Sequence, residues 1–366
     1  MRRCSFVILM LVACVSLSAY GVPSITVDEG NSWYGKVREY ANPFDPGRQY
    51  DNAVIDITVT PGWTDDTLRR IVNRVDGSNA PNGGGRLTKT GDSRGELVWM
   101  TFTAPGSSSF TAGTVIVSQT VGSGFSHTMD YTFKLGNGTV KADGTLSGGS
   151  WREIGELSQS GNGSTNTFYI ANPGGTYNTF RLDITAGYNG GITYADFSEV
   201  LILPDKLDYV KPSATSNYGG WGSAEGLLNL NNSSSSGWAY TGGARIDNED
   251  VKVTFTFGDV PQKLDAIVFW SFDHYADATF TLQYEDASGT MVDLATISMP
   301  YNDPKGWVLP VELTESLYTT KVVMNFGNSG ANVNFREVMF FEKAIPEPAT
   351  MSLLALGGLA LLRRRT

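Results

Sequence analysis

Cysteine and histidine are scarce in this chain. Its 366 residues include only two cysteines, Cys4 and Cys14, and two histidines, His127 and His274. Both cysteines lie near the amino terminus, so the body of the chain cannot form a disulfide framework or a cysteine metal site. Its stability must therefore come from apolar cores, and a Ser-His-Asp triad would have to use one of the two histidines.

Catalytic sequence motifs are absent as well. GFSHT (124–128) lacks the second glycine of G-x-S-x-G, and the chain has no H-E-x-x-H and no P-loop. A carboxylate pair for glycoside hydrolysis stays open, because 37 acidic residues offer many pairs. The net charge is -10, and five of the 27 basic residues lie at the two ends. The chain between these two basic ends is therefore strongly acidic and repels phosphate backbones. We expect no nucleic-acid partner.

The amino terminus has the pattern of a secretion signal. MRRCS supplies positive charge, FVILMLVA (6–13) the apolar core, and Ala19 and Gly21 the small residues before a cleavage site. We therefore predict a signal peptide over residues 1–21 and export through the Sec pathway. Leu11 to Cys14 also fits a loose lipoprotein box, although an ordinary signal is the favoured interpretation.

The rest of the chain indicates strands separated by turns. The 42 glycines, together with Asn, Asp and Ser clusters, punctuate short alternating or β-branched runs. This spacing predicts an all-β protein with two jelly-roll β-sandwich domains in tandem. The expected strands include ELVWMTFT (96–103), GTVIVSQTV (113–121), DYTFKL (130–135), TFRLDIT (179–185), VKVTFTF (251–257), LDAIVFW (264–270), TFTLQYE (279–285) and TKVVMNF (320–326).

One segment has a helical pattern instead. In TDDTLRRIV (64–72), Leu68, Ile71 and Val72 follow a spacing of three and four residues. Asp65 and Asp66 precede them, as acidic residues do in the first turn of a helix. We expect a short helix here.

The two halves of the chain repeat each other. ADFSEVLIL (195–203) and VNFREVMFF (333–341) share Phe-x-Glu-Val followed by apolar residues. Upstream, IVSQTV (116–121) matches IVFWSF (267–272) in order and approximate spacing. A polar link with two prolines lies at 201–214. We therefore expect one β-domain over 22–204 and a second over 205–343. Residues 22–60 are either an extension or strands that complete the first copy.

The second copy resembles the galactose-binding-like domains of the discoidin (coagulation factor 5/8 type C) superfamily. The resemblance rests on the order of GLLNLNNSSSSGWAYTGG (226–243), VKVTFTFGDV (251–260), LDAIVFW, TFTLQYEDASG (279–289), KVVMNF and FREVMFFE. The first copy matches through IVNRVDGS (71–78), YTFKLGNG (131–138) and SWREIGEL (150–157). The resemblance implies a jelly-roll sandwich that binds glycans through loops at one end and often holds a structural calcium.

Aromatic residues of the second copy suggest a carbohydrate site. Sugars need aromatic faces against their C–H surfaces and polar groups for their hydroxyls. We expect Trp221 and Tyr240, in Gly/Ser-rich segments, and Asp273, His274 and Tyr275, in SFDHYADA (271–278), to bind a ligand. Trp238 lies in the same aromatic cluster, but the resemblance implies a buried core tryptophan at this position. Trp270 belongs to a strand run and is also interpreted as a core residue.

The same resemblance implies calcium. Glu337 on the last strand would pair with the loop around Asn229 and Asn231, and Glu199 with Asp76, since calcium prefers oxygen ligands. The plain alternative is that both glutamates hydrogen-bond a loop or cap a strand end. NLNNS (229–233) stands where the family has an Asp-Gly turn, so one carboxylate is missing.

The tail, residues 344–366, combines three features. Pro346, Glu347 and Pro348 predict an extended stretch. The apolar segment 349–362 would span roughly 21 Å as a helix, at about 1.5 Å per residue, against about 30 Å of hydrocarbon. This segment is too short for a good permanent span, and two glycines interrupt it. The positive cluster Arg363, Arg364 and Arg365 follows.

This order of features resembles the PEP-CTERM sorting signal of Gram-negative bacteria. The resemblance implies an exosortase-type processing enzyme as partner, transient membrane contact, and delivery to the cell envelope, the cell surface or the extracellular matrix. We therefore expect an exported, non-enzymatic protein that binds extracellular polysaccharide. A structural or adhesive matrix protein with protein partners, and a glycan-active enzyme, are the alternatives.

Overall fold

The computed structural model shows an all-β protein. It describes residues 24–26, 37–44, 56–66, 68–72, 85–88, 97–118, 129–159, 168–186, 194–197, 199–218, 221–230, 238–240, 250–271, 278–299, 307–327 and 333–344. Every strand pair recorded there is antiparallel, and three short 3-10 helices occur: η1 (Leu68–Val72), η2 (Pro105–Ser107) and η3 (Ala224–Leu228). Within these ranges no helix is long and apolar enough to cross a membrane. The expected signal peptide and the expected tail helix lie outside them.

The first pair of sheets, here called the amino-terminal sandwich, joins a five-stranded and a three-stranded sheet. The five-stranded sheet has the order β12 (Trp151–Gln159), β9 (Met129–Gly136), β15 (Thr179–Ala186), β6 (Leu97–Thr103) and β3 (Asp56–Val59). The three-stranded sheet has the order β13 (Phe168–Ala171), β8 (Thr114–Ser118) and β17 (Glu199–Leu203). Small sheets flank them: β10 (Thr139–Val140) with β11 (Leu146–Ser147), β14 (Thr176–Tyr177) with β7 (Phe110–Thr111), and β16 (Tyr194–Phe197) with β5 (Gly85–Thr88) and β4 (Thr64–Asp66).

The second pair, the carboxy-terminal sandwich, joins a six-stranded and a seven-stranded sheet. The first has the order β1 (Ser24–Thr26), β25 (Met291–Met299), β24 (Ala278–Glu285), β27 (Lys321–Gly327), β22 (Val251–Thr256) and β19 (Ser213–Ser216). The other has the order β2 (Val37–Glu39), β26 (Val308–Thr319), β23 (Gln262–Ser271), β28 (Val333–Lys343), β21 (Trp238–Tyr240) and β20 (Trp221–Gly222), and β18 (Leu207–Val210) also pairs with β28.

The two sandwiches repeat one strand order. The order β12-β9-β15-β6-β3 corresponds to β25-β24-β27-β22-β19, and β13-β8-β17 corresponds to β26-β23-β28. All eight strands expected from the sequence are present. Strand pairing sets the register between IVSQTV and IVFWSF, which the sequence matched only in order and approximate spacing. Ser118 pairs with Glu199 as Trp270 pairs with Glu337, so VIVS (115–118) corresponds to IVFW (267–270).

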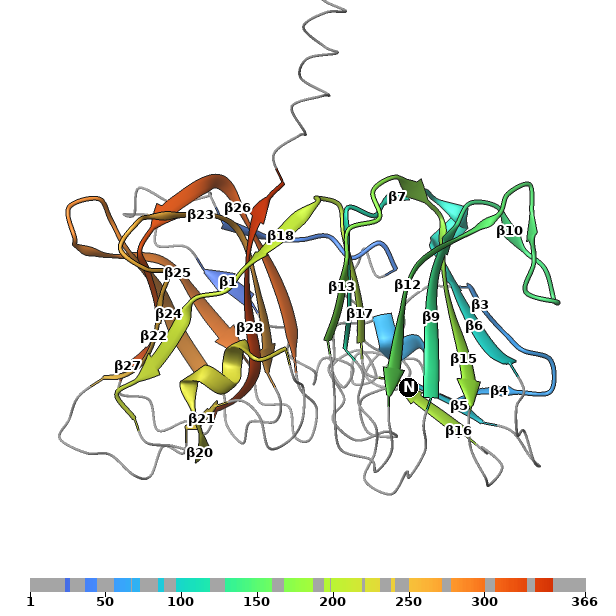
Figure 1. Cartoon of the computed structure of the whole chain (residues 1–366), viewed down its shortest axis with the longest axis horizontal. Coiled ribbons are helices and arrows are strands. Elements are labelled where there is room, and N and C mark those ends of the chain that lie inside the picture. Colours follow the sequence, from blue (N-terminus) through green and yellow to red (C-terminus); the bar gives the residue numbers. More distant parts are fainter. Residues whose placement is uncertain are drawn as a thin grey trace, which may run out of the picture.

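Three apolar cores separate four sheet layers. One core fills each sandwich, and a third lies between the three-stranded and the seven-stranded sheets. Figure 1 shows the sandwiches side by side, with β13 and β17 facing β28. The third core contains equivalent residues of the two copies: Leu201 and Leu203 from β17, and Met339 and Phe341 from β28.

Burial on both faces explains the continuous apolar runs. Successive side chains of a strand point to opposite faces. In β17, Val200 and Ile202 therefore enter the amino-terminal core, and Leu201 and Leu203 enter the third core. Trp270 of β23 is fully buried in the third core, where its ring meets that of Phe168 edge-on at a centroid distance of 4.6 Å. The packing interpretation of Trp270, and of Trp238 at 1% exposure, is confirmed.

Two local expectations are corrected. β1 and β2 do not complete the first copy, because they pair with β25 and β26 of the carboxy-terminal sandwich; β3 pairs with β6 of the first. The helix expected at 64–72 is a strand followed by a 3-10 turn: Asp65 and Asp66 pair with β5, and η1 begins at Leu68. The apolar spacing did mark buried residues, since Leu68, Ile71 and Val72 are fully buried.

Trp270→Ala should destabilise the protein by about 3–5 kcal/mol, because the change leaves a cavity between the two sandwiches. Chemical denaturation followed by circular dichroism measures the loss. Tyr318→Ala is the control, because Tyr318 is 62% exposed and its truncation should change the free energy of unfolding by less than about 0.5 kcal/mol. Equal effects of the two changes would contradict the third core as a stabilising contact.

Candidate functional site

One end of the seven-stranded sheet gathers the segments expected to bind a ligand. Trp238 of β21 pairs with Phe335 of β28, which pairs with Ser271 at the end of β23. With strands about 4.8 Å apart, Ser271 lies roughly 10 Å from Trp238 along this row. Tyr240 lies two positions beyond Trp238, toward the same end of the sheet. Trp221 of β20 pairs with Ala239, the residue before Tyr240.

The segment expected to carry the ligand-binding residues starts from this row. The Ser271 N–H donates to the Trp307 carbonyl at 2.8 Å, and the Trp307 N–H donates to the Ser271 hydroxyl at 3.0 Å. Asp273, His274 and Tyr275 follow directly in the chain and lie outside the described residues, as do the side chains of Trp221 and Tyr240. The structure thus brings the backbone of β20 and β21 and the start of the 272–277 segment to one end of the sheet.

The strand equivalence reveals a longer repeat that sequence comparison alone missed. Residues 125–135 and 272–282 align without a gap as F-x-H-x-x-D-x-T-F-x-L. Both stretches lead into equivalent strands, β9 and β24, where Phe133 and Phe280 enter the sandwich cores. Both histidines of the chain belong to this repeat. His127 and His274 themselves lie outside the described residues.

The glutamates expected to bind calcium are fully buried. Glu199 begins β17 and Glu337 lies in β28. Alternation from Leu201 and Met339 places both on the strand faces that look toward the third core. Among the described residues no group of three or more His, Cys, Asp or Glu could hold a metal ion.

The other proposed calcium ligands give no further support. Asn231 and Asp76 lie outside the described residues. Asn229 is the C-cap of η3, and the next residue, Leu230, has a positive φ of 53°. The Leu230 carbonyl accepts a hydrogen bond from the Phe168 N–H at 3.3 Å, so this loop touches the amino-terminal sandwich. Calcium binding stays a prediction.

A buried cation–π cluster on the amino-terminal sandwich has a structural role. The Arg181 guanidinium lies 4.9 Å from the Trp99 ring and 5.6 Å from the Trp151 ring. Its Nε donates to Asp183 at 2.6 Å, and its Nη1 donates to the Gly144 carbonyl at 2.6 Å. These contacts hold the β10–β11 hairpin against the five-stranded sheet.

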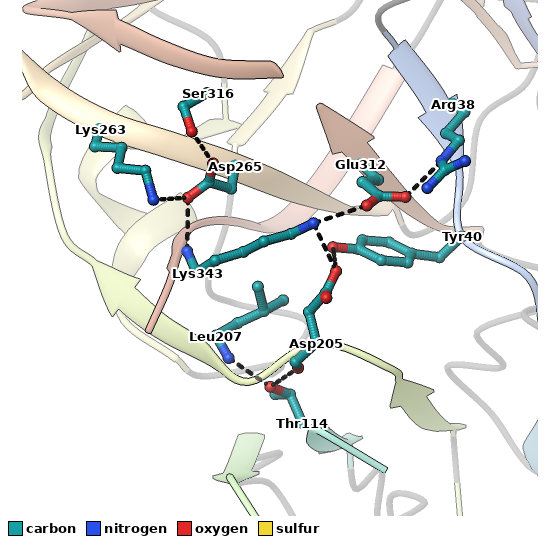
Figure 2. Close-up of polar contacts among 10 residues, drawn as sticks. All are labelled: Arg38, Tyr40, Thr114, Asp205, Leu207, Lys263, Asp265, Glu312, Ser316 and Lys343. Carbon is teal, nitrogen blue, oxygen red and sulfur yellow. Dashed lines mark hydrogen bonds and ion pairs between the residues drawn. The ribbon is translucent and has the colours of Figure 1, made fainter. Parts of the chain in front are cut away.

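A second polar site lies where β28 ends (Figure 2). Lys343 Nζ is 3.0 Å from Asp205 Oδ2 and 2.9 Å from Glu312 Oε1, and Glu312 Oε2 is 2.6 Å from Arg38 Nε. These contacts connect β2, β26, β28 and the segment after β17. We call the whole group the tail-base cluster: Arg38, Tyr40, Thr114, Asp205, Leu207, Lys263, Asp265, Glu312, Ser316 and Lys343.

The link between the sandwiches is part of this cluster. The Tyr40 hydroxyl donates to Asp205 Oδ2 at 3.1 Å. Burial raises the pKa of Tyr40, and the negative charge of Asp205 raises it further, so the hydroxyl stays protonated. The Thr114 hydroxyl donates to the Asp205 carbonyl at 2.7 Å and accepts from the Leu207 N–H at 2.9 Å. A Cβ at Gly113 would lie 2.1 Å from the Asp205 carbonyl carbon, so the link passes directly against β8.

Two buried carboxylates hold the cluster together electrostatically. Asp265 accepts hydrogen bonds from Lys263 Nζ at 2.8 Å, from the Ser316 hydroxyl at 2.6 Å and from the Lys343 N–H at 2.7 Å. Burial opposes its ionisation, but these donors hold the pKa of Asp265 below its ordinary value. In the same way, Glu312 has a lowered pKa because its two cations outweigh burial.

The comparison with protein families identifies the tail. A family model described as the PEP-CTERM protein-sorting motif matches residues 344–365, which confirms the resemblance predicted from the sequence. The motif indicates an exported surface or extracellular protein of a Gram-negative bacterium. The match begins at the residue that follows Lys343 in the chain.

Solved structures give only weak likenesses, and no curated protein matches. Allantoicase from Saccharomyces cerevisiae is 11% identical, with 87% of this chain and 99% of that chain covered and a TM-score of 0.32. A fucolectin from striped bass (Morone saxatilis) serum is 9% identical, with coverages of 84% and 100% and a TM-score of 0.30. The CBM32-1 and CBM32-2 domains of Clostridium perfringens ZmpB are 10% identical, with coverages of 88% and 100% and a TM-score of 0.28. Scores this low support no inference about ligand or activity.

The tail-base cluster should make stability depend on acid. Since the pKa values of Glu312 and Asp265 are lower in the folded chain than their ordinary values of 4.5 and 3.8, the unfolded chain binds more protons at low pH. The free energy of unfolding should therefore fall as pH falls through and below these values. Glu312→Gln should lower stability by about 1–2 kcal/mol at neutral pH and flatten this dependence.

Urea denaturation at a series of pH values measures both effects. Glu153→Gln, on the exposed side of β12, is the control and should retain the wild-type pH dependence. If Glu312→Gln has the same acid dependence as the wild type, the ion pairs of Glu312 do not stabilise the fold.

Proposed function

We propose that this chain is an exported, non-enzymatic protein that binds extracellular polysaccharide through loops at one end of its carboxy-terminal sandwich. The PEP-CTERM tail directs it to the cell surface or the extracellular matrix through an exosortase-type enzyme. The finer description of the fold, two tandem jelly-roll domains divided between residues 204 and 205, belongs to the same proposal. So does a structural calcium in either copy.

The placement of Trp221 and Tyr240 carries the proposal. These two residues lie on neighbouring strands at the end of the sheet from which the 272–277 segment leaves. A polysaccharide site requires aromatic rings beside hydrogen-bonding groups, and Asp273, His274 and Tyr275 supply those groups within a short reach of Ser271. Strand pairing puts Ser271, from which that segment leaves, at the same end of the sheet as Trp221, 50 positions earlier in the sequence.

Two further observations support the same loops. The Phe-x-His-x-x-Asp pattern occurs in both copies, although the sequences before it differ in length and composition. In addition, the chain has no G-x-S-x-G, H-E-x-x-H or P-loop motif, which favours binding over catalysis. The calcium proposal depends on Glu199 and Glu337, for which burial alone does not favour a metal over a hydrogen-bonded loop.

His274→Ala and Tyr275→Ala should each weaken polysaccharide binding about tenfold or more, because removing an aromatic or hydrogen-bonding anchor costs about 1–2 kcal/mol. The wild-type chain is first applied to an array of bacterial exopolysaccharide fragments. The affinity of each variant for the bound fragment is then measured by titration calorimetry.

Tyr318→Ala is the matched control for this experiment. Tyr318 is exposed and pairs with Lys263, roughly 25 Å along β23 from Ser271, so its removal should leave binding unchanged. If the wild type binds no glycan and assembles with itself or with a protein, the structural or adhesive alternative is correct. Release of sugar from the array would identify a glycan-active enzyme.

The tail should be removed from the protein at its destination. Mass spectrometry of protein isolated from a bacterium with a PEP-CTERM sorting system should find a carboxyl terminus upstream of Arg363. Replacing Pro346 and Pro348 with alanine should preserve the full-length form, because the extended motif is lost. A wild-type chain that still ends at Thr366 would contradict sorting.

A further inference from the structure

The folded body and the sorting motif meet without a spacer. The Ala344 N–H donates to the Lys206 carbonyl at 2.9 Å, and the family match begins at this same residue. Only Ile345 stands between Ala344 and Pro346. Two residues of extended chain reach at most about 7 Å, so the first proline is held close to the body.

The residues just before the motif are already bonded within a sheet. Lys343 pairs with Leu207 of β18, and its N–H donates to Asp265. Two residues earlier, Phe341 pairs with Tyr209 of β18 and with Ala266 of β23. A peptidase cleft binds its substrate as an extended strand through main-chain hydrogen bonds. These residues therefore cannot enter such a cleft while β28 is fully paired.

Release of the strand end is easy at first and then becomes difficult. The Lys343–Asp205 ion pair is partly exposed, at 36% and 30%, and contributes little to stability. The pair with Glu312, whose side chain is 8% exposed, is the stronger restraint on the strand end. Phe341 is fully buried in the third core, so its release would open the contact between the sandwiches. Opening of the strand should therefore stop at Phe341 and free residues 342–344.

We propose that the Lys343 ion pairs form a latch that controls processing of the tail. With the latch closed, the processing enzyme meets only Ile345 and the Pro-Glu-Pro motif. With the latch open, it receives an extended segment that begins at Glu342, and processing proceeds on an otherwise folded body. The proposal rests on the matched sorting motif and is independent of polysaccharide binding.

A pulse-chase experiment in a bacterium with a PEP-CTERM sorting system tests the latch, with precursor and processed forms separated by gel electrophoresis and identified by mass spectrometry. Lys343→Met keeps the apolar stem and removes the charge, and it should speed processing about two- to fivefold. The matched control is Lys321→Met, because Lys321 Nζ pairs with Glu285 at 2.7 Å and is 34% exposed, but lies in β27 of the six-stranded sheet, which does not contain β28. This control should be processed at the wild-type rate.

A spacer of Gly-Ser-Gly-Ser between Ala344 and Ile345 provides a test that leaves the fold untouched. It should raise the rate at least as much as Lys343→Met, and Lys343→Met should have no further effect in its presence. A spacer chain processed at the wild-type rate would overturn the proposal, even if Lys343→Met fails to fold. Equal acceleration by Lys321→Met would also overturn it, since general destabilisation would then be the cause. Absence of processing in every form would refute the sorting role, and the latch with it.

Discussion

The third core is the contact on which the rest of the structure depends. The three-stranded sheet of the amino-terminal sandwich and the seven-stranded sheet of the carboxy-terminal sandwich are each covered on one face by the other sheet of their own sandwich. Their remaining faces pack against each other. An apolar strand face left in water would be costly, so neither β17 nor β28 could remain as it is without the other copy. The corresponding residues of the two copies meet there, much as identical subunits do in a symmetric dimer. The link at Asp205 and the latch at Lys343 lie at one edge of this contact.

Local sequence patterns predicted the strands well, and long-range features poorly. ELVWMTFT and VKVTFTF have a clear composition and period, which are local properties. The sequence matched the two copies only approximately in strands buried on both faces, because uniform apolarity leaves no alternation to fix the register. β2 was assigned to the first domain, but it pairs with β26, where Arg38 and Glu312 are 274 positions apart in the sequence. Local residue spacing carries no information about so distant a partner. The tail-base cluster was missed for the same reason.

The ligand-binding roles of the loop residues stay predictions, whereas the packing of two tryptophans could be predicted from the sequence. The tryptophans at 238 and 270 were correctly interpreted as core residues, and strand pairing gives Trp221 and Tyr240 a common position at the end of the sheet. The Phe-x-His repeat became visible only when β9 and β24 were seen to hold equivalent places, because the loops before it differ in length. The tail differs from all of these: its charge, proline and apolar segments adjoin one another in the chain, so the sequence was sufficient to identify it.

The direction of β28 has a mechanical consequence. Its first residue, Val333, lies at the end of the sheet with the candidate ligand loops, and its last, Lys343, lies at the base of the tail. A pull applied between the loops at one end of the sheet and the chain at the other end would therefore run along the length of this strand. Its hydrogen bonds to β23 and β18 would carry such a load together, in shear, whereas a load across the strand would break them one at a time. The orientation of β28 therefore suits this strand to resist a load applied along its own length.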